Sequence, residues 1–266
     1  MKKKRADVLL IEQGLVDSKG EALSFILAGK VFTTKEIKIL TAGEQLASDT
    51  ELYIKGQEKK YVSRGGFKLE KAIEQFNLTL ENTIVLDIGS STGGFTDVSL
   101  KNGAKLVYAL DVGTNQLAWE LRNHDRVVVM EQTNFRYSKL EDFKEGRPGF
   151  ATIDVSFISL ELILPALYGI LEDQGEVVAL IKPQFEADRE DVGEGGIISD
   201  PSVYQTVLQN ILSFAQDEKF ALLNVTVSPI TGAKGNIEFL AHLKKNGTNR
   251  KTKEELIQHV LENLPN

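Results

Sequence analysis

The stretch Ile84-Val-Leu-Asp-Ile-Gly-Ser-Ser-Thr-Gly-Gly-Phe-Thr-Asp97 decides the fold. Its short apolar run is rich in β-branched residues, reaches Asp87, passes through a glycine-bearing turn and continues into a helical pattern. That order predicts the first strand, loop and helix of a nucleotide-type binding fold.

Strand and helix patterns alternate after this stretch. We expect strands at 83–87, 106–111, 127–131, 150–154, 176–182, 220–228 and 236–243, and helices notably at Thr114–His124, Ile158–Leu171 and Pro201–Asp217. Such alternation predicts an α/β fold with a mostly parallel sheet covered on both faces. Only residues 228–235 join the last two strands, too few for a helical crossover, so that pair should be antiparallel. A seven-stranded sheet with an antiparallel last strand resembles the Rossmann-like methyltransferases.

The composition of the 266 residues narrows the class of protein. Hydrophobic content of 42% and charged content of 26% are ordinary for a globular protein. No cysteine is present, which excludes disulfides, thiolate metal sites and cysteine nucleophiles. No apolar run approaches the ~20 residues that span a bilayer, and Met1–Arg5 is not followed by an apolar signal core. We therefore expect a cytoplasmic protein with no membrane and no metal partner.

Charge is unevenly distributed along the chain. The net charge is -7, but residues 1–60 carry 11 Lys and Arg against 9 Asp and Glu. A basic face for nucleic acid and scattered solvated charge are both open on these counts.

The first sixty residues have a pattern of their own. Two short helical patterns, the first ending at Gly14 and the second starting at Ser18 with Glu21 in capping-box spacing, precede β-like pieces at 31–33 and 51–55. A polar junction at 56–60 separates this small unit from a helical pattern at 63–76, for which Ser63 is the expected N-cap.

The glycine loop indicates which cofactor the sheet holds. Gly89, Gly93 and Gly94 give G-x-x-x-G-G rather than the dinucleotide spacing G-x-G-x-x-G. An acidic residue before the first glycine suits S-adenosylmethionine, which has an amino group that needs a carboxylate and no pyrophosphate. Asp111 would accept hydrogen bonds from the ribose. The expected cofactor-binding residues are Asp87, Gly89, Ser90, Ser91, Thr92, Gly93, Gly94, Phe95 and Asp111. A purely structural role for the glycines is the alternative.

Asp154 and Lys182 end neighbouring predicted strands at the edge where ligands bind in open α/β sheets. A lysine that ends a buried strand is uncommon unless it is paired. A structural ion pair between these two residues is therefore one interpretation. Glu238 in the last strand and Lys68 in the helix before the glycine loop are candidates for the same site.

Lys68, Asp154, Lys182 and Glu238 resemble, in order and strand placement, the Lys-Asp-Lys-Glu set of FtsJ-like ribose 2′-O-methyltransferases. More closely, five stretches resemble the TlyA, or hemolysin A, family of rRNA methyltransferases: 61–70, 87–97, 154–160, 180–186 and 232–240. The resemblance implies that Lys182 acts as a neutral base on a ribose hydroxyl and that Asp154 and Glu238 orient the amines. Like-charge repulsion from Lys68 would favour the neutral amine, and the two carboxylates would oppose that effect. The long loop 183–200 and the amphipathic helix after Thr252 receive no specific role.

A second resemblance covers the N-terminal unit. Ile26-Leu-Ala-Gly-Lys-Val31 is similar to the RNA-binding module shared by small-subunit ribosomal protein four and several RNA-modifying enzymes, although Thr33-Thr-Lys-Glu36 replaces the usual Asn-Gly turn. The resemblance implies phosphate contacts for Lys3, Lys4, Arg5, Lys19, Lys30 and Arg64. The implied domains are a small α+β RNA-binding domain at 1–58, a linker at 59–62, a methyltransferase domain at 63–247 and a tail with an amphipathic helix at 248–266.

Two other RNA methylations are excluded by the residues. Methylation of a pyrimidine carbon generally uses a cysteine adduct, and no cysteine exists. Methylation of an exocyclic amine usually shows Asp/Asn-Pro-Pro-aromatic, and residues 154–157 lack both prolines. Ribose methylation remains, and the resemblance to the TlyA family implies that the acceptor is the 2′-hydroxyl of a cytidine in ribosomal RNA. The alternatives are a non-catalytic ribosome-associated RNA-binding protein and a true hemolysin.

Overall fold

The computed structural model describes residues 3–13, 15–16, 18–56, 60–198, 200–232 and 235–265. The chain divides into two compact units, Met1–Lys60 with Ile230–Gly235 and Tyr61–Pro229 with Asn236–Asn266. The division after Lys60 falls inside the expected linker 59–62, of which Lys59 lies outside the described residues, as does the expected helix end Gly14.

The first unit is a small α+β structure. Its elements are β1 (Lys3–Arg5), α1 (Ala6–Glu12), α2 (Lys19–Leu27), β2 (Val31–Thr33), β3 (Gln45–Ala47) and β4 (Leu52–Ile54). Strands β1 and β3 pair antiparallel, as do β2 and β4. Ser18 starts α2 by accepting a hydrogen bond from the Glu21 backbone N–H, as its spacing predicted. Leu9, Leu10 and Ile26 are buried between the helices and strands.

The second unit is built on a seven-stranded sheet. Its strands are β5 (Ile84–Ile88), β6 (Leu106–Leu110), β7 (Val127–Met130), β8 (Phe150–Ile153), β9 (Glu176–Ile181), β10 (Phe220–Val227) and β11 (Phe239–Lys245), in the order β10-β11-β9-β8-β5-β6-β7. The strands β5 to β9 are parallel, and β11 is antiparallel to both β9 and β10. The predicted mostly parallel sheet with an antiparallel last strand is confirmed.

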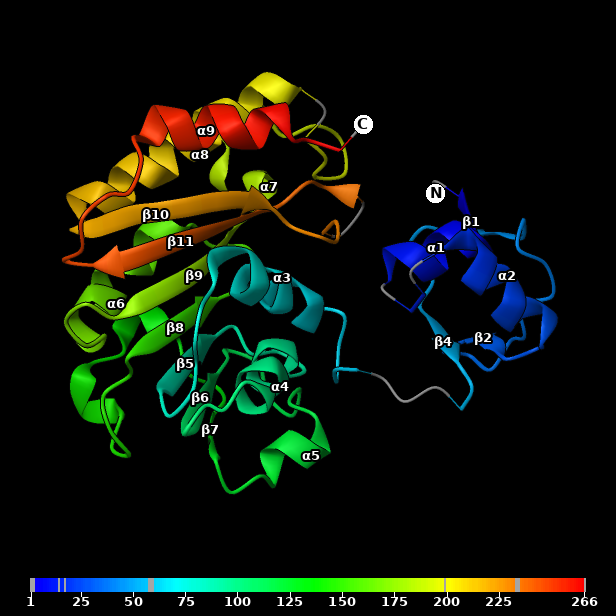
Figure 1. Ribbon diagram of the computed structural model, residues 1–266, viewed down its shortest axis with the longest axis horizontal. Coiled ribbons are helices and arrows are strands. Elements are labelled where there is room, and N and C mark those ends of the chain that lie inside the picture. Colours follow the sequence, from blue (N-terminus) through cyan, green and yellow to red (C-terminus); the bar gives the residue numbers. More distant parts are fainter. Residues whose placement is uncertain are drawn as a thin grey trace. The chain divides into compact units, whose positions relative to one another are not determined.

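Successive residues of each central strand face opposite layers. Leu86 and Ile88 belong to one hydrophobic cluster and Val85 to the other. One layer contains α6 (Leu164–Ile170), α8 (Pro201–Asp217) and α9 (Lys253–Glu262); the other contains α3 (Gly66–Phe76), α4 (Gly94–Lys101) and α5 (Trp119–Arg122). Figure 1 shows α8 and α9 along β10, and α3 and α4 on the opposite face. Helices therefore cover both faces of the central strands and shield them from solvent, as the apolar runs predicted.

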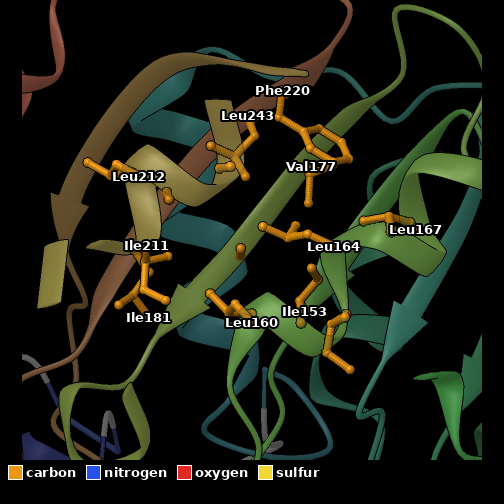
Figure 2. Packing of buried hydrophobic residues seen from close by; sticks show 14 of the residues in the cluster. Ile153, Leu160, Leu164, Leu167, Val177, Ile181, Ile211, Leu212, Phe220 and Leu243 are labelled. Atoms are coloured by element: carbon orange, nitrogen blue, oxygen red, sulfur yellow. The ribbon is translucent and has the colours of Figure 1, made fainter. Parts of the chain in front are cut away.

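The larger cluster fills the space between the sheet and α6, α8 and α9. In Figure 2, Val177 of β9 lies next to Leu164 of α6, and Ile181 of β9 lies beside Ile211 of α8. These four side chains are buried, so the central strands have fixed positions from which their carboxyl ends can present functional groups.

Two local predictions were wrong. The helix expected at Thr114–His124 is reduced to the single turn of α5, because Asn115 has a φ of 54° and Glu131 accepts the N–H groups of Asn115 and Gln116. Ser63 does not cap the helix after it, because α3 starts at Gly66 with Gly65 at the N-cap position. Contacts with the distant Glu131 replace the helical start expected at Thr114. The turn that ends at Gly65 replaces the helical start expected at Ser63.

The C-terminal helix α9 follows the expected cap. Thr252 and Glu255 form a capping box. Leu256, Ile257 and Val260 are buried against the cluster that contains α8 and β10. The helix is thus part of the layer that covers the sheet.

Candidate functional site

The carboxyl edge of the sheet gathers four charged side chains. Asp154 directly follows β8 and Lys182 directly follows β9. Because β11 runs antiparallel and its first residue Phe239 pairs with Ile181, the preceding Glu238 lies at the same edge. Lys68, in the first turn of α3, is the fourth member. Side chains from four separate parts of the sequence therefore meet at one edge of the sheet. Asp154 and Lys182 lie at the strand ends where they were predicted.

Both lysines share Asp154. Lys182 Nζ lies 2.5 Å from Asp154 Oδ1, and Lys68 Nζ lies 3.4 Å from Asp154 Oδ2. Lys68 Nζ also donates a 2.7 Å hydrogen bond to Glu238 Oε2. The ion pair between Asp154 and Lys182, which the sequence left as a structural interpretation, is thus one link of a chain of four charged groups.

Burial makes this cluster electrostatically strong. Lys68, Lys182 and Glu238 are each less than 9% exposed, whereas the Asp154 side chain is 19% exposed. Burial alone would raise the pKa of Asp154, but the charges of Lys68 and Lys182 outweigh it and hold that pKa below its usual value. The cluster therefore keeps an ionised carboxylate between two amines and opens to solvent at Asp154.

Neutral and aromatic side chains beside Lys182 were not among the predicted site residues. Ser156 Oγ accepts a 3.0 Å hydrogen bond from Lys182 Nζ. Phe157 is 89% exposed, has a φ of 64° and contacts the ring of Phe185 at 4.8 Å between centroids. An exposed phenylalanine in a left-handed conformation is a signal that only the structure provides, because the sequence offers no reason for a positive φ there.

The segment after Lys182 is tied to the same edge. It begins with α7 (Pro183–Glu186), whose Gln184 lies 3.5 Å from Glu238 Oε1. Burial raises the pKa of Glu186 to about 7, and its Oε1 accepts the backbone N–H of Leu160. Further along, Asn236 binds the backbone of residues 196 and 198 with both atoms of its amide. Both ends of the long loop are therefore held by hydrogen bonds to residues that flank the strands.

The glycine loop approaches this cluster closely. Gly89 has a φ of 85°, and a Cβ there would collide with the backbone carbonyl oxygen of Asp154. Gly93 has a φ of 99°, and a Cβ there would meet the side chains of Leu117 and Leu121. Only glycine satisfies both the conformation and the space at these two positions, so the loop can pass this close to Asp154 and to the two leucines. Within the loop, Ser91 and Thr92 are exposed, whereas Gly93 and Gly94 are buried.

Asp87 lies beneath the loop. It is fully buried, and its two oxygens accept hydrogen bonds from Thr96 Oγ1 at 2.6 Å and Thr152 Oγ1 at 2.9 Å. Burial raises the pKa of Asp87 to about 6, although both threonine hydroxyls oppose the shift. In this structure the carboxyl group joins β5 to β8 and α4, and a cofactor contact for it remains a prediction.

Asp111 lies at the end of β6, on the other side of the loop. Its Oδ2 accepts the backbone N–H of Ser91 at 2.8 Å, and its Oδ1 accepts that of Gly113 at 2.7 Å. Glu131 binds the next part of this connection, and Arg122 holds the pKa of Glu131 at about 2. Asp111 and Glu131 thus fix the backbone on one side of the expected cofactor site, and Asp87 fixes the loop from below.

The other predicted cofactor residues are part of the loop, but they are not equally accessible. Ser91 and Thr92 lie at its turn, with Thr92 accepting the backbone N–H of Ala118. Ser90 and Phe95 are 5% and 4% exposed, and Phe95 packs in the cluster beneath α4. The residues available to a ligand are therefore mainly backbone groups and Asp111.

The predicted RNA-binding cations have different surroundings. Lys3, Lys19, Lys30 and Arg64 are exposed. Lys4 pairs with Glu12 at 2.7 Å, and Arg5 pairs with Asp7 at the same distance. Their sequence clustering did not indicate these partners, which reduce the free positive charge of β1.

Comparison with known proteins gives the family. Residues 61–245 match the model of the FtsJ-like methyltransferases. The chain belongs to this family. The match contains all four charged side chains of the sheet edge and the whole glycine loop.

Individual relatives cover nearly the full chain. A Bacillus subtilis protein named as a candidate rRNA methyltransferase is 52% identical over 98% of this chain and 94% of its own. The Mycobacterium tuberculosis 16S/23S rRNA (cytidine-2′-O)-methyltransferase TlyA is 40% identical over 90% of this chain and 89% of its own. The solved structure of a candidate hemolysin from Streptococcus thermophilus is 52% identical, has a TM-score of 0.77 and covers 98% of this chain and 97% of its own. The expected membership in the TlyA, or hemolysin A, family is confirmed.

Among the described residues, no helix is both long and apolar enough to cross a membrane.

Proposed function

We propose that this FtsJ-like methyltransferase transfers a methyl group from S-adenosylmethionine to the 2′-hydroxyl of a cytidine in ribosomal RNA. The observation that carries the proposal is the contact of Lys68, Asp154, Lys182 and Glu238 at the sheet edge, directly beside a loop that only glycine can form at Gly89. The names of the relatives support the substrate.

The glycine loop and Asp111 would hold the cofactor. The exposed turn at Ser91 and Thr92 offers backbone groups to a ligand, and Asp111 has lone pairs left for the ribose hydroxyls after accepting two backbone N–H groups. When bound, S-adenosylmethionine supplies an electrophilic methyl group on a sulfonium. Asp87 supports the loop through Thr96 and Thr152.

Lys182 would remove the proton of the acceptor hydroxyl. A ribose hydroxyl is a poor acid, so a neutral amine within hydrogen-bond reach lowers the barrier to its attack. Asp154 accepts one N–H of Lys182 and holds the amine, while Lys68 and Glu238 fix Asp154 from the other side. The ribose oxygen would give its proton to Lys182 Nζ as it bonds to the methyl carbon, and the sulfur–methyl bond would break with its electron pair left on sulfur as a neutral thioether. Asp154 is 19% exposed, so the acceptor would approach from that side.

The first unit would bind the RNA. We assign residues 1–58 to an RNA-binding domain, 59–62 to a linker, 63–247 to the methyltransferase domain and 248–266 to the tail. Exposed Lys3, Lys19 and Lys30 of this unit are available to phosphates, and Lys4 and Arg5 would have to exchange their carboxylate partners. Exposed Arg64, near the start of the second unit, would add a further phosphate contact.

The proposal is tested by mapping 2′-O-methyl groups in rRNA from cells with and without the gene. We expect at least one ribose-methylated cytidine to disappear in its absence and to return when the gene is restored. An unchanged map would reject ribosomal RNA as the substrate.

A further inference from the structure

Two acceptors of different charge hold the amine of Lys182. Asp154 Oδ1 lies 2.5 Å from Nζ, and Ser156 Oγ lies 3.0 Å from it. An ammonium group has three N–H donors, whereas a neutral amine has two N–H groups and one lone pair. The two acceptors therefore leave one direction open at Nζ, which the lone pair occupies when the amine is neutral.

We propose that Ser156 is a positioning residue that directs the lone pair of Lys182 toward the acceptor hydroxyl. This inference rests on the proposed function, because it requires Lys182 to be the base. With one N–H on Asp154 and the other on Ser156, the lone pair takes the one direction left to the amine. Without the serine, the amine turns about its Cε–Nζ bond and only a fraction of its orientations point at the proton.

The position of Ser156 is set by contacts between the two segments that follow β8 and β9. The next residue, Phe157, has a φ of 64°, a conformation that other contacts must stabilise. Its ring contacts Phe185, and Glu186 accepts the N–H of Leu160 at 3.0 Å. The chain that follows Ser156 is thus attached at two points, Phe157 and Leu160, to the turn that follows Lys182.

Ser156 differs from Asp154, the other partner of Lys182, because it carries no charge. The charged and titratable groups around Lys182 are Asp154 in direct contact, Lys68 beyond Asp154 and Glu238 beyond Lys68, with Glu186 at the end of α7. Ser156 is the one acceptor in contact with Lys182 Nζ, among the described residues, that holds the amine without adding a negative charge.

The test is methyl transfer by Ser156→Ala and Ser156→Thr across a range of pH. We expect Ser156→Ala to lower kcat roughly 10- to 100-fold with an unchanged KM for S-adenosylmethionine. The acid limb of its kcat profile should move to lower pH, because the ammonium form loses an acceptor. Ser156→Thr retains the hydroxyl and should restore both the rate and the limb.

The matched control is Ser213→Ala. Lys253 Nζ donates a 2.6 Å hydrogen bond to Ser213 Oγ on α8, so the same kind of lysine–serine bond is lost outside the site, and neither kcat nor the pH profile should change. The inference is overturned if Ser156→Ala keeps the wild-type rate, if its rate falls without a shift of the limb, or if threonine gives no rescue. Lys182→Ala separates this failure from that of the proposed function, since transfer retained without the amine removes the base itself.

Discussion

The two sides of the site use aspartate in opposite ways. On the cofactor side, Asp87 is bound by two threonine hydroxyls, and burial raises its pKa to about 6. On the reacting side, Asp154 lies between two lysines, which hold its pKa below the usual value against the effect of burial. Both residues lie at the carboxyl ends of neighbouring strands, β5 and β8. Strand position thus brings carboxylates to the edge, and their partners decide their chemistry.

The two sides also differ in how far apart their parts are in the sequence. The cofactor side is made largely of backbone between residues 84 and 118, where glycine conformations determine the shape. The reacting side joins Lys68, Asp154, Lys182 and Glu238, which only the assembled sheet brings together. We therefore expect substitutions on the reacting side to affect catalysis, and those on the cofactor side to affect stability and cofactor affinity.

The largest expected effect is that of Lys182→Ala on catalysis. Loss of the base should lower kcat by roughly 100- to 10,000-fold, while S-adenosylmethionine affinity measured by calorimetry stays near wild type. Lys182→Arg is the informative companion, because arginine restores the charge beside Asp154 but does not become a neutral base. Recovery of activity in Lys182→Arg would mean that the residue acts only as an ion-pair partner.

Gly89→Ala should affect the cofactor side and reach the reacting side as well. The added Cβ meets the Asp154 carbonyl oxygen in a conformation with φ of 85°, so we expect roughly 4 kcal/mol lower free energy of unfolding together with weaker cofactor binding. Chemical denaturation gives the first quantity. Gly196→Ala is the matched control, because Gly196 has a φ of 78° with no atom near its Cβ position. Equal losses in the two variants would show that the contact with Asp154 has no energetic role.

Asp87→Asn should change how stability depends on pH. The folded pKa of about 6 lies above the unfolded value of ~3.9, so the native state binds more protons between these values and its stability falls as pH rises from about 4 to 6. The total is roughly 3 kcal/mol, and the asparagine variant should lack it. Asp154, with a lowered pKa, contributes the opposite sign and loses its stabilisation as pH falls below about 4. If the stability of wild type and of Asp87→Asn changed with pH in the same way, the raised pKa of Asp87 in the folded protein would be contradicted.

Phe157→Ala should have the smallest effect. Because the ring is 89% exposed, its loss should leave the free energy of unfolding nearly unchanged. An exposed ring beside the base offers a stacking surface worth roughly 1 to 2 kcal/mol for an RNA base, so the KM for RNA should rise about fivefold or more. Phe157→Tyr should retain the wild-type KM. A KM for RNA unaffected by alanine would exclude Phe157 from RNA contact.

Much of the site follows from the sequence because strand ends obey simple rules. The alternating apolar runs predicted the strands, and the carboxyl edge of a parallel sheet then placed Asp154 beside Lys182. The short connection 228–235 predicted an antiparallel β11, which brings Glu238 to the same edge. These inferences use only periodicity and connection length, which the sequence contains directly.

The unpredicted features depend on register and on distant partners. The bond between Thr152 and Asp87 exists because the two residues are opposite each other in paired strands, and a one-residue shift would remove it. Glu131 replaces helical bonds in the connection after Asp111, which is why the helix expected at Thr114–His124 shrinks to one turn. Phe157 has a positive φ, which no sequence pattern indicates. The hydrogen bond between Ser156 and Lys182 in the same turn could not be predicted either.

The most direct test is nucleoside analysis after methyl transfer in a purified system. The full chain would be incubated with ribosomal subunits and S-adenosylmethionine carrying an isotopically labelled methyl group, and the rRNA digested and analysed by mass spectrometry. We predict that the label appears as 2′-O-methylcytidine and is lost with Lys182→Ala. Label on a base, or no label in rRNA from either subunit, would contradict the assignment of the Lys68, Asp154, Lys182 and Glu238 cluster to ribose methylation.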